Sequence, residues 1–167
     1  MDFKKLANQY RDELLDNVLP FWLEHSQDLE FGGYFTCLDR EGKVFDTDKF
    51  IWLQGREVWM FSMLYNKVEK RQEWLDCAVQ GGEFLKKYGH NGDYNWYFSL
   101  DRSGRPLVEP YNIFSYTFAA MAFGQLSLAT GNQEYADIAR KTFDIILSKV
   151  DNPKGLSLIH ISEPTRL

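Results

Sequence analysis

Apolar residues recur every three or four positions along most of the chain, which is the spacing of amphipathic helices. The first such stretch begins at Phe3 and predicts a helix that ends near Glu24. Pro20 lies inside it and is expected to bend or interrupt the helix, because proline lacks a backbone N–H and crowds the preceding turn. The same periodicity predicts four further helices, over 50–68, 72–88, 113–130 and 133–150.

Two segments between these helices have the pattern of short β-hairpins. Residues 34–38 and 43–45 flank a turn-forming Asp-Arg-Glu-Gly, and residues 96–108 repeat the pattern around Asp-Arg-Ser-Gly. The two turns lie 62 residues apart, and each hairpin has a helix before it and another after it. This arrangement is typical of a helix–hairpin–helix repeat, although two unrelated hairpins with a common turn sequence would give the same pattern.

Helix pairs of this kind cannot bury their apolar faces alone, so several units must pack side by side. The chain holds about two and a half units, which is too few to close a ring. The strongly apolar helix over 113–130 would then keep part of its surface uncovered. We therefore expect an all-α-dominated fold with short hairpins between the helices.

The last twelve residues, 156–167, break the pattern of the preceding chain. Residues 156–166 match the translation of a transposon adapter used in preparing sequencing libraries; the alternative is a natural terminal strand. We therefore assign residues 1–155 to one domain and treat 156–167 as a sequencing-adapter artefact. His160 then carries no functional weight, and the natural chain is expected to continue past Gly155.

Composition and charge narrow the class of protein. Of the 167 residues 44% are hydrophobic, enough for a real core, and the net charge of −5 comes without a Lys/Arg block. Neither nucleic acid nor an anionic membrane is therefore expected as a partner. Cys37 and Cys77 lie far apart without metal-ligand spacing, so we expect no disulfide and no metal site. Without an apolar leader or a run of 18 apolar residues, the protein is expected to be cytoplasmic.

The most informative chemistry lies near the start of the second predicted helix. Four residues at helical spacing share one of its faces: Trp52, Arg56, Trp59 and Met63. An arginine on an inward apolar face is costly unless it is paired or meets a ligand. Arg56 is therefore either part of a buried ion pair, with Glu57 as one candidate partner, or a substrate contact. The flanking indoles favour a carbohydrate, because aromatic rings stack on the apolar face of a sugar beside a hydrogen-bonding fork.

The repeat adds candidates in the following unit. A shift of 62 residues takes Trp52 to Phe114, and it takes Gln54 to Tyr116. Each unit thus delivers an aromatic and a polar group to the start of a helix, and helix starts that ring a common axis form a pocket. Gln54, Phe114 and Tyr116 are therefore candidate binding residues; core packing is the alternative role for Phe114 and Tyr116.

The histidines do not form an acid–base pair. His25 ends the first helix, where interaction with the helix dipole accounts for it, and His90 lies in a Gly/Asn loop. Asp46 and Asp48 are interpreted as turn or cap formers. The sequence has no G-x-S-x-G, P-loop or G-x-G-x-x-G motif, and so gives no support to nucleophilic hydrolysis or dinucleotide chemistry.

Longer segments carry a resemblance to a known family. The most specific is KFIWLQGREVWMFSMLY with the preceding GGYFTCLDREGKV, and GGEFL, FSLDRSGRP and IFSYTFAAMAF agree with it. From about Leu14 to Gly155 the chain resembles the N-acylglucosamine 2-epimerase family, also called renin-binding protein. The resemblance implies an incomplete (α/α)6 barrel, in which this chain supplies part of a ring of six helix pairs.

The resemblance also implies an isomerase that interconverts N-acetylglucosamine and N-acetylmannosamine by proton transfer at C2. One histidine would remove the proton next to the C1 carbonyl, a cis-enediolate would form, and a second histidine would return a proton to the other face. Arg56 matches the arginine of the family's LQGR motif and would hold the oxygen that gains negative charge, with Trp52 and Trp59 as pocket wall. The two histidines lie further along in the family, so this chain alone is expected to be inactive.

Further expectations follow from the resemblance alone. Phe114 followed by Ser115 favours an acylamino sugar, because the mannose isomerase and cellobiose 2-epimerase branches tend to have a tyrosine there. No cofactor is expected to be required, although some members use a nucleotide as activator, and the parent is expected to be a homodimer. The alternatives are another sugar 2-epimerase or aldose–ketose isomerase, such as mannose isomerase or cellobiose 2-epimerase, and a non-catalytic binding protein, as the family's other name suggests.

Overall fold

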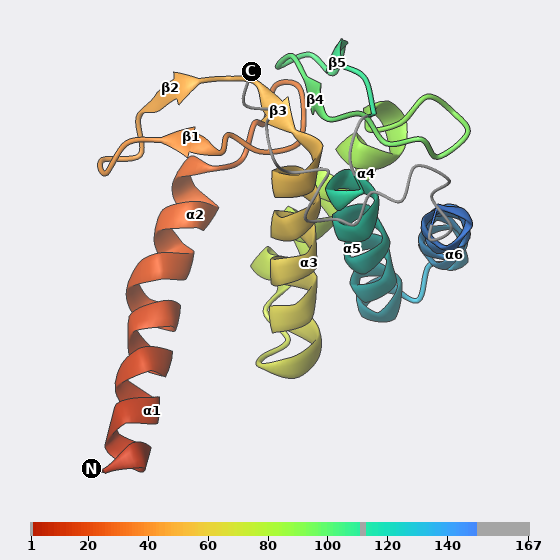
Figure 1. Cartoon of the computed structure of the whole chain (residues 1–167). Helices are drawn as coiled ribbons and strands as arrows, with labels where there is room; N and C mark the ends of the chain where they lie inside the picture. The colour runs from red at the N-terminus through yellow and green to blue at the C-terminus, as the bar shows by residue number, and fades with distance from the viewer. Residues whose placement is uncertain (1, 111–112, 150–167) are drawn as a thin grey trace, which may run out of the picture.

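Helices dominate the computed structural model, which describes residues 2–110 and 113–149 (Figure 1). The helical elements are α1 (Phe3–Glu13), the π-helical turn η1 (Leu14–Val18), α2 (Leu19–His25), α3 (Ile51–Lys67), α4 (Gln72–Tyr88), α5 (Phe114–Thr130) and α6 (Gln133–Ser148). The strands are β1 (Cys37–Leu38), β2 (Val44–Asp46), β3 (Lys49–Phe50), β4 (Ser99–Leu100) and β5 (Pro106–Val108). The predicted helices and both hairpins are confirmed. The proposed adapter segment, 156–167, lies outside the described residues.

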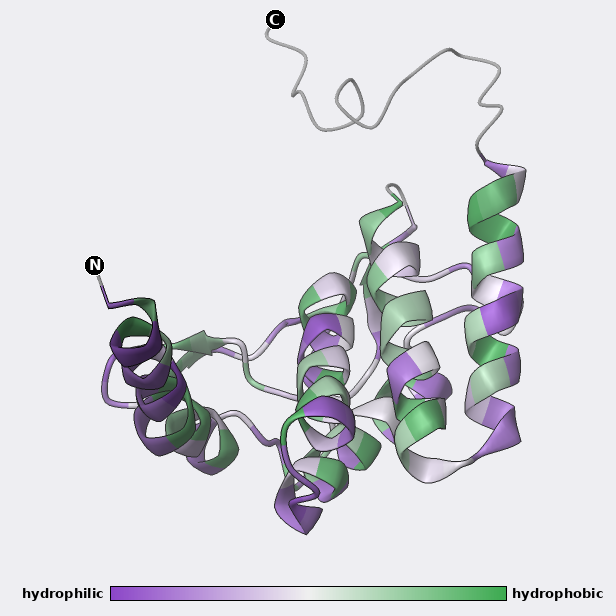
Figure 2. Ribbon diagram, turned by 90° about the horizontal axis from the view of Figure 1, so that it is seen from below, coloured by the Kyte–Doolittle hydropathy of each residue, from purple (hydrophilic) through white to green (hydrophobic). Residues whose placement is uncertain are grey.

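The N-terminal helix continues through Pro20 instead of breaking there. Proline has no N–H to donate to the preceding turn, and the chain widens just before it into η1, where the N–H of Leu19 donates to the carbonyl of Leu14. The expected interruption thus takes the form of one wide turn. α1, η1 and α2 form a rod at one side of the molecule, and α6 lies at the other side (Figures 1 and 2).

The two hairpin turns are built in the same way, which supports the 62-residue repeat. In each turn an aspartate carboxylate, that of Asp39 or Asp101, accepts the backbone N–H groups two and four residues later, all at 2.9 Å. The turn glycines, Gly42 and Gly104, have φ angles of 83° and 93°, which favour glycine. Equal spacing and equal hydrogen bonding make two unrelated hairpins the weaker interpretation.

The segments that lead into the hairpins repeat as well. Tyr34 and Trp96 lie 62 residues apart, and both rings are fully buried. Each donates a hydrogen bond to the second helix after its hairpin: Tyr34 Oη to the carbonyl of Cys77 in α4 at 2.8 Å, and Trp96 Nε1 to Thr142 Oγ1 in α6 at 3.0 Å. One buried aromatic ring therefore joins each hairpin to its own helix pair.

The core lies among α3, α4 and α5. α3 packs on both α5 and α4, and α5 packs in turn on α6. Gly55 permits the close approach of α3 and α5, because a Cβ atom there would lie 3.0 Å from the carbonyl carbon of Phe118. Of the helices within residues 2–110 and 113–149, none combines the length and apolar character that crossing a membrane requires.

Candidate functional site

Arg56 lies on an exposed part of α3. No carboxylate of the described residues pairs with its guanidinium, whose Cζ lies 5.8 Å from the ring centroid of Phe118 on α5. The buried ion pair with Glu57, one of the two alternatives for this arginine, is therefore not observed in the described part of the chain. An exposed cation beside an aromatic ring remains available to an anionic or polar ligand.

One of the aromatic candidates, Trp52, lies beside the same phenyl ring as Arg56. The ring of Trp52 lies 6.1 Å from that of Phe118, with an interplanar angle of 49°. Trp52 and Trp59 are half-buried, and Phe114, the first residue of α5, is 43% exposed. The structure thus brings Trp52 and Arg56 together around Phe118, and Trp59 follows Arg56 along α3.

Gln54 and Tyr116 have structural contacts in place of the open positions expected for them. Gln54 is fully buried, and its carboxamide bonds both the N–H and the carbonyl of Tyr34, each at 2.8 Å. Tyr116 is 3% exposed, and its hydroxyl donates to Asn95 Oδ1 at 3.2 Å. Each side chain therefore holds the segment that leads into its own hairpin. The side chains of Gln54 and Tyr116, which we expected to face a pocket, both point into the core.

Glu57 is a buried carboxyl group beside the end of α2. Its Oε1 lies 2.5 Å from Ser26 Oγ, which in turn lies 2.6 Å from the carbonyl of Trp22. Burial raises the pKa of Glu57 to about 8, despite the hydrogen bond with Ser26. A hydroxyl has one proton and cannot donate to both neighbours. A protonated Glu57 that donates to Ser26, while Ser26 donates to Trp22, satisfies all three groups.

This protonation makes stability depend on pH. The folded-state pKa of Glu57 is raised above the unfolded value near 4.5, so its stabilising contribution is complete below pH 4.5 and is lost as the pH rises towards 8. The free energy of unfolding is therefore expected to fall steadily across that interval. In the whole protein, Glu57→Gln should remove this slope and should be more stable than the wild type at pH 8. Urea unfolding between pH 5 and 8 measures both; an unchanged slope would contradict the assignment. Glu73→Gln, on the exposed side of α4, is the matched control.

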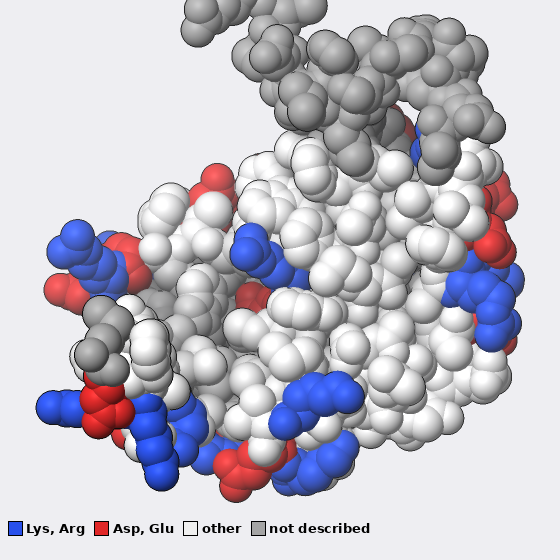
Figure 3. Space-filling view, turned by 60° about the horizontal axis from the view of Figure 1, so that its bottom comes forward, with Lys and Arg blue, Asp and Glu red and all other residues white. Residues whose placement is uncertain are grey.

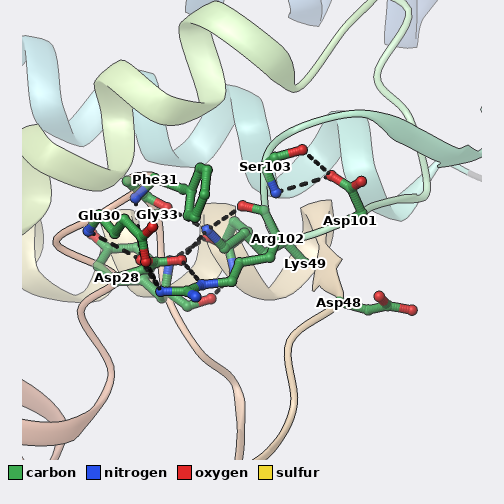
Figure 4. A network of polar contacts seen from close by, with 12 residues as sticks. Asp28, Glu30, Phe31, Gly33, Asp48, Lys49, Asp101, Arg102 and Ser103 are labelled. Atoms are coloured by element: carbon green, nitrogen blue, oxygen red, sulfur yellow. Dashed lines mark hydrogen bonds and ion pairs between the residues drawn. The ribbon is translucent and has the colours of Figure 1, made fainter.

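A charge network built around one buried ion pair fixes the strand that precedes α3 (Figure 4). The side chains of Asp28 and Lys49 are both fully buried, and Lys49 Nζ donates to Asp28 Oδ2 at 2.9 Å. Lys49 Nζ also donates to the carbonyls of Gly32 and Arg102. Arg102 donates to both oxygens of Asp28, at 2.9 and 3.1 Å, and pairs with Glu30 at 2.9 Å. All three Lys49 protons therefore have acceptors.

The same network sets the charge state of Asp28. Burial raises the pKa of Asp28, but hydrogen bonds from Arg102 and Lys49 outweigh burial and lower it to about 2. Lys49 belongs to β3, which pairs antiparallel with β4 of the second hairpin and was not expected from the sequence. Because β3 runs directly into α3, the network and this pairing hold the helix start that carries Trp52 and Arg56.

The described residues contain no cluster of metal ligands, and each of their two histidines contacts an aromatic ring. No group of three or more His, Cys, Asp or Glu within them could hold a metal ion. His90 stacks on Tyr94 with ring centroids 4.7 Å apart, and burial lowers its pKa. His25 lies at the end of α2 against Phe21, with centroids 4.9 Å apart. Cys37 and Cys77 are free thiols, as expected.

Two parts of this region were not found by sequence reasoning. Phe118 is the repeat equivalent of Arg56, so the 62-residue shift that singled out Phe114 would also have found Phe118. Asp28, Lys49 and Arg102 come from three separate segments, and no local spacing relates them. Only the folded chain brings these three charges together.

Comparisons with known proteins agree on one family. A family model described as N-acylglucosamine 2-epimerase (GlcNAc 2-epimerase) matches residues 33–164. N-acylglucosamine 2-epimerase of Mus musculus is 44% identical over 156 residues, and that of Homo sapiens is 45% identical over 147 residues. Among solved structures, cellobiose 2-epimerase from Bacillus thermoamylovorans has a TM-score of 0.80 at 26% identity.

Coverage differs greatly between this chain and its relatives. The alignments cover 90% of this chain with the mouse protein and 85% with the human protein, but 37% and 34% of those proteins. The solved cellobiose 2-epimerase structure covers 97% of this chain, and 43% of that structure is matched. The chain thus spans about a third of the length of the curated relatives it matches.

Proposed function

Because the chain belongs to the N-acylglucosamine 2-epimerase family, we propose that the whole protein interconverts N-acetylglucosamine and N-acetylmannosamine. The observation that carries the proposal is the exposed guanidinium of Arg56, which has no carboxylate partner in the described residues and lies beside the ring of Phe118, which Trp52 also contacts. A positive group held beside rings suits an open-chain sugar, because the rings contact its apolar face and the cation meets its oxygens.

The chemistry would proceed at C2 of the open-chain sugar. Removal of the proton next to the C1 carbonyl leaves negative charge on the carbonyl oxygen and gives a cis-enediolate. Arg56 would stabilise that oxygen as its charge develops. Return of a proton to the opposite face of C2 inverts the centre. The two bases would be histidines from the rest of the protein, as the family resemblance implies.

We propose further that the chain forms part of an (α/α)6 barrel whose other helix pairs cover its open sides. At one side α1 has no buried residue and exposes Phe3 and Tyr10; at the other side α6 exposes Phe143 and Leu147. Leu128 of α5 is 70% exposed. Figure 3 shows a broad area free of charged side chains on the lower side of the molecule. Apolar faces at both ends of a helix array are what neighbouring units would bury.

The chain alone should show no epimerase activity. It supplies Arg56 and rings near it, whereas the proton transfers need two bases that it would not contain. Residues 1–155 expressed alone should give no N-acetylmannosamine from N-acetylglucosamine, while the whole protein converts one into the other. Turnover by the isolated segment would contradict the assignment of both bases to the rest of the protein.

A substrate panel tests the proposed function against its alternatives. The whole protein is offered N-acetylmannosamine, mannose and cellobiose, and the products are separated by chromatography. We expect conversion of N-acetylmannosamine, in keeping with Phe114 and Ser115 at the start of α5. Preference for mannose or cellobiose would favour another isomerase or 2-epimerase of the same barrel. No conversion of any sugar would leave a non-catalytic binding protein.

Two properties complete the proposal. The proton transfers would use side chains alone, so the reaction should proceed in protein freed of metals and nucleotides. The rate with and without added nucleotide tests whether a nucleotide acts as an activator. The whole protein should form a homodimer, which light scattering coupled to size-exclusion chromatography measures directly.

A further inference from the structure

Phe118, on α5, lies at the contact between α3 and α5, beside both Arg56 and Trp52 of α3. Its ring centroid is 5.8 Å from Cζ of Arg56 and 6.1 Å from the ring of Trp52. The close packing at Gly55 brings it there, because a Cβ atom on that glycine would lie 3.0 Å from the Phe118 carbonyl carbon and 3.2 Å from its Cβ. Gly55 directly precedes Arg56, so the tightest part of the helix contact adjoins the arginine.

Arg56 has few other restraints. It is exposed, and no carboxylate or carbonyl of the described residues forms a hydrogen bond or ion pair with its guanidinium. An arginine side chain has several rotatable bonds, and its entropy in solvent favours many conformations. The face of an aromatic ring within about 6 Å attracts a guanidinium without consuming its N–H donors, which stay available to a ligand.

From this geometry we propose that Phe118 is a positioning residue, whose ring holds the guanidinium of Arg56 in the orientation that the sugar oxygen requires. This inference rests on the proposed function for its effect on catalysis, but not for its effect on the arginine. Phe118 would act through Arg56 and would not itself react. The 62-residue repeat relates the two positions: α3 carries Arg56 in one unit, and α5 carries Phe118 at the equivalent position of the next unit.

The direct test follows the Nε–H group of Arg56 by nitrogen-15 NMR in the whole protein, with Arg56→Lys identifying its signal. Phe118→Leu keeps apolar volume but removes the ring, and should give the Arg56 signal the relaxation of a mobile side chain. Phe118→Tyr keeps the ring and should keep the wild-type relaxation. Unchanged relaxation in Phe118→Leu, with the protein folded, would overturn the proposal. This readout does not depend on any enzymatic activity.

A double-mutant cycle then tests the effect on catalysis. Phe118→Leu should lower kcat about three- to ten-fold with little change in KM, and Phe118→Tyr should retain most of kcat. In the Arg56→Ala background, Phe118→Leu should have no further effect on kcat, because the guanidinium that Phe118 would orient is absent. An equal loss in both backgrounds would overturn the proposal. Phe45→Leu, on exposed β2, is the matched control and should leave kcat unchanged.

The NMR and kinetic measurements test the role of Phe118 and the proposed function separately. If the whole protein proves inactive on every sugar, the proposed function fails, while the NMR comparison still decides whether Phe118 restrains Arg56. If epimerisation occurs but Phe118→Leu changes neither the relaxation nor kcat, the positioning role fails and the proposed function stands.

Discussion

Replacing Arg56 by alanine in the whole protein should lower kcat for epimerisation about 100- to 1,000-fold, the range seen when one donor to a developing oxyanion is removed. KM should change far less, because the guanidinium is needed most when negative charge has formed on the sugar oxygen. Arg56 forms no ion pair with the described residues, so its loss should not unfold the protein. Steady-state kinetics and a thermal unfolding curve measure these effects together.

Two further variants sharpen this prediction. Arg56→Lys keeps the positive charge but loses the planar fork, and should recover only part of kcat. Arg71→Ala removes a partly exposed arginine that pairs with Glu69 before α4, and should leave kcat within about two-fold of the wild type. A kcat for Arg56→Ala that stays close to the wild-type value would contradict the role proposed for this residue.

The largest expected effect on stability comes from the buried ion pair of Asp28 and Lys49, which Arg102 joins from the more exposed side. Asp28→Asn removes the negative charge that both cations share and leaves Lys49 buried beside a neutral amide. Breaking a buried pair in this way is expected to lower the free energy of unfolding by about 3–5 kcal/mol. Urea unfolding of the whole protein at pH 7 gives the value.

The controls separate a buried charge from lost packing. Glu30→Gln removes an exposed partner of Arg102 and should cost no more than about 1 kcal/mol. Lys49→Met combined with Asp28→Asn should recover part of the loss, because no unpaired lysine then remains buried. If Asp28→Asn costs no more than Glu30→Gln, the buried network does not stabilise the start of α3 as argued.

The regular part of the fold was predictable from sequence because it depends on local patterns. Apolar periodicity located the helices, and the shared turn sequence located the hairpins and the repeat between Asp39 and Asp101. β3 was missed because its two residues are a strand only through pairing with β4, which lies about fifty positions further along. The wide turn before Pro20 was missed because the sequence shows that a proline removes one backbone hydrogen bond, but it does not show whether the helix kinks, breaks or widens in response.

The candidate site was predictable only in part. Helical spacing correctly put Trp52 and Arg56 on one face, but it could not say that Arg56 would be exposed. Gln54 lies two residues after Trp52, and a shift of two residues on a helix points the side chain to the opposite face. The Gln54 side chain therefore enters the core, where both of its polar atoms form hydrogen bonds with the backbone of Tyr34. Tyr116, at the equivalent position of the next unit, is buried in the same way, which is the core-packing alternative given for it.

The resemblance to N-acylglucosamine 2-epimerases, stated from the sequence, is confirmed by the family match over residues 33–164. The family match does not by itself assign a role to Arg56, for which the argument is the open guanidinium and the rings beside it. The fate of the C2 proton distinguishes the proposed chemistry from its alternatives.

Solvent deuterium exchange tests that reaction most directly. The whole protein is incubated with N-acetylmannosamine in D2O, and the sugars are followed by proton NMR. Proton transfer through an enediolate predicts that the C2 proton signal disappears as N-acetylglucosamine forms, with deuterium at C2 and at no other carbon. Epimerisation without deuterium at C2, or no exchange in an otherwise folded protein, would contradict the account.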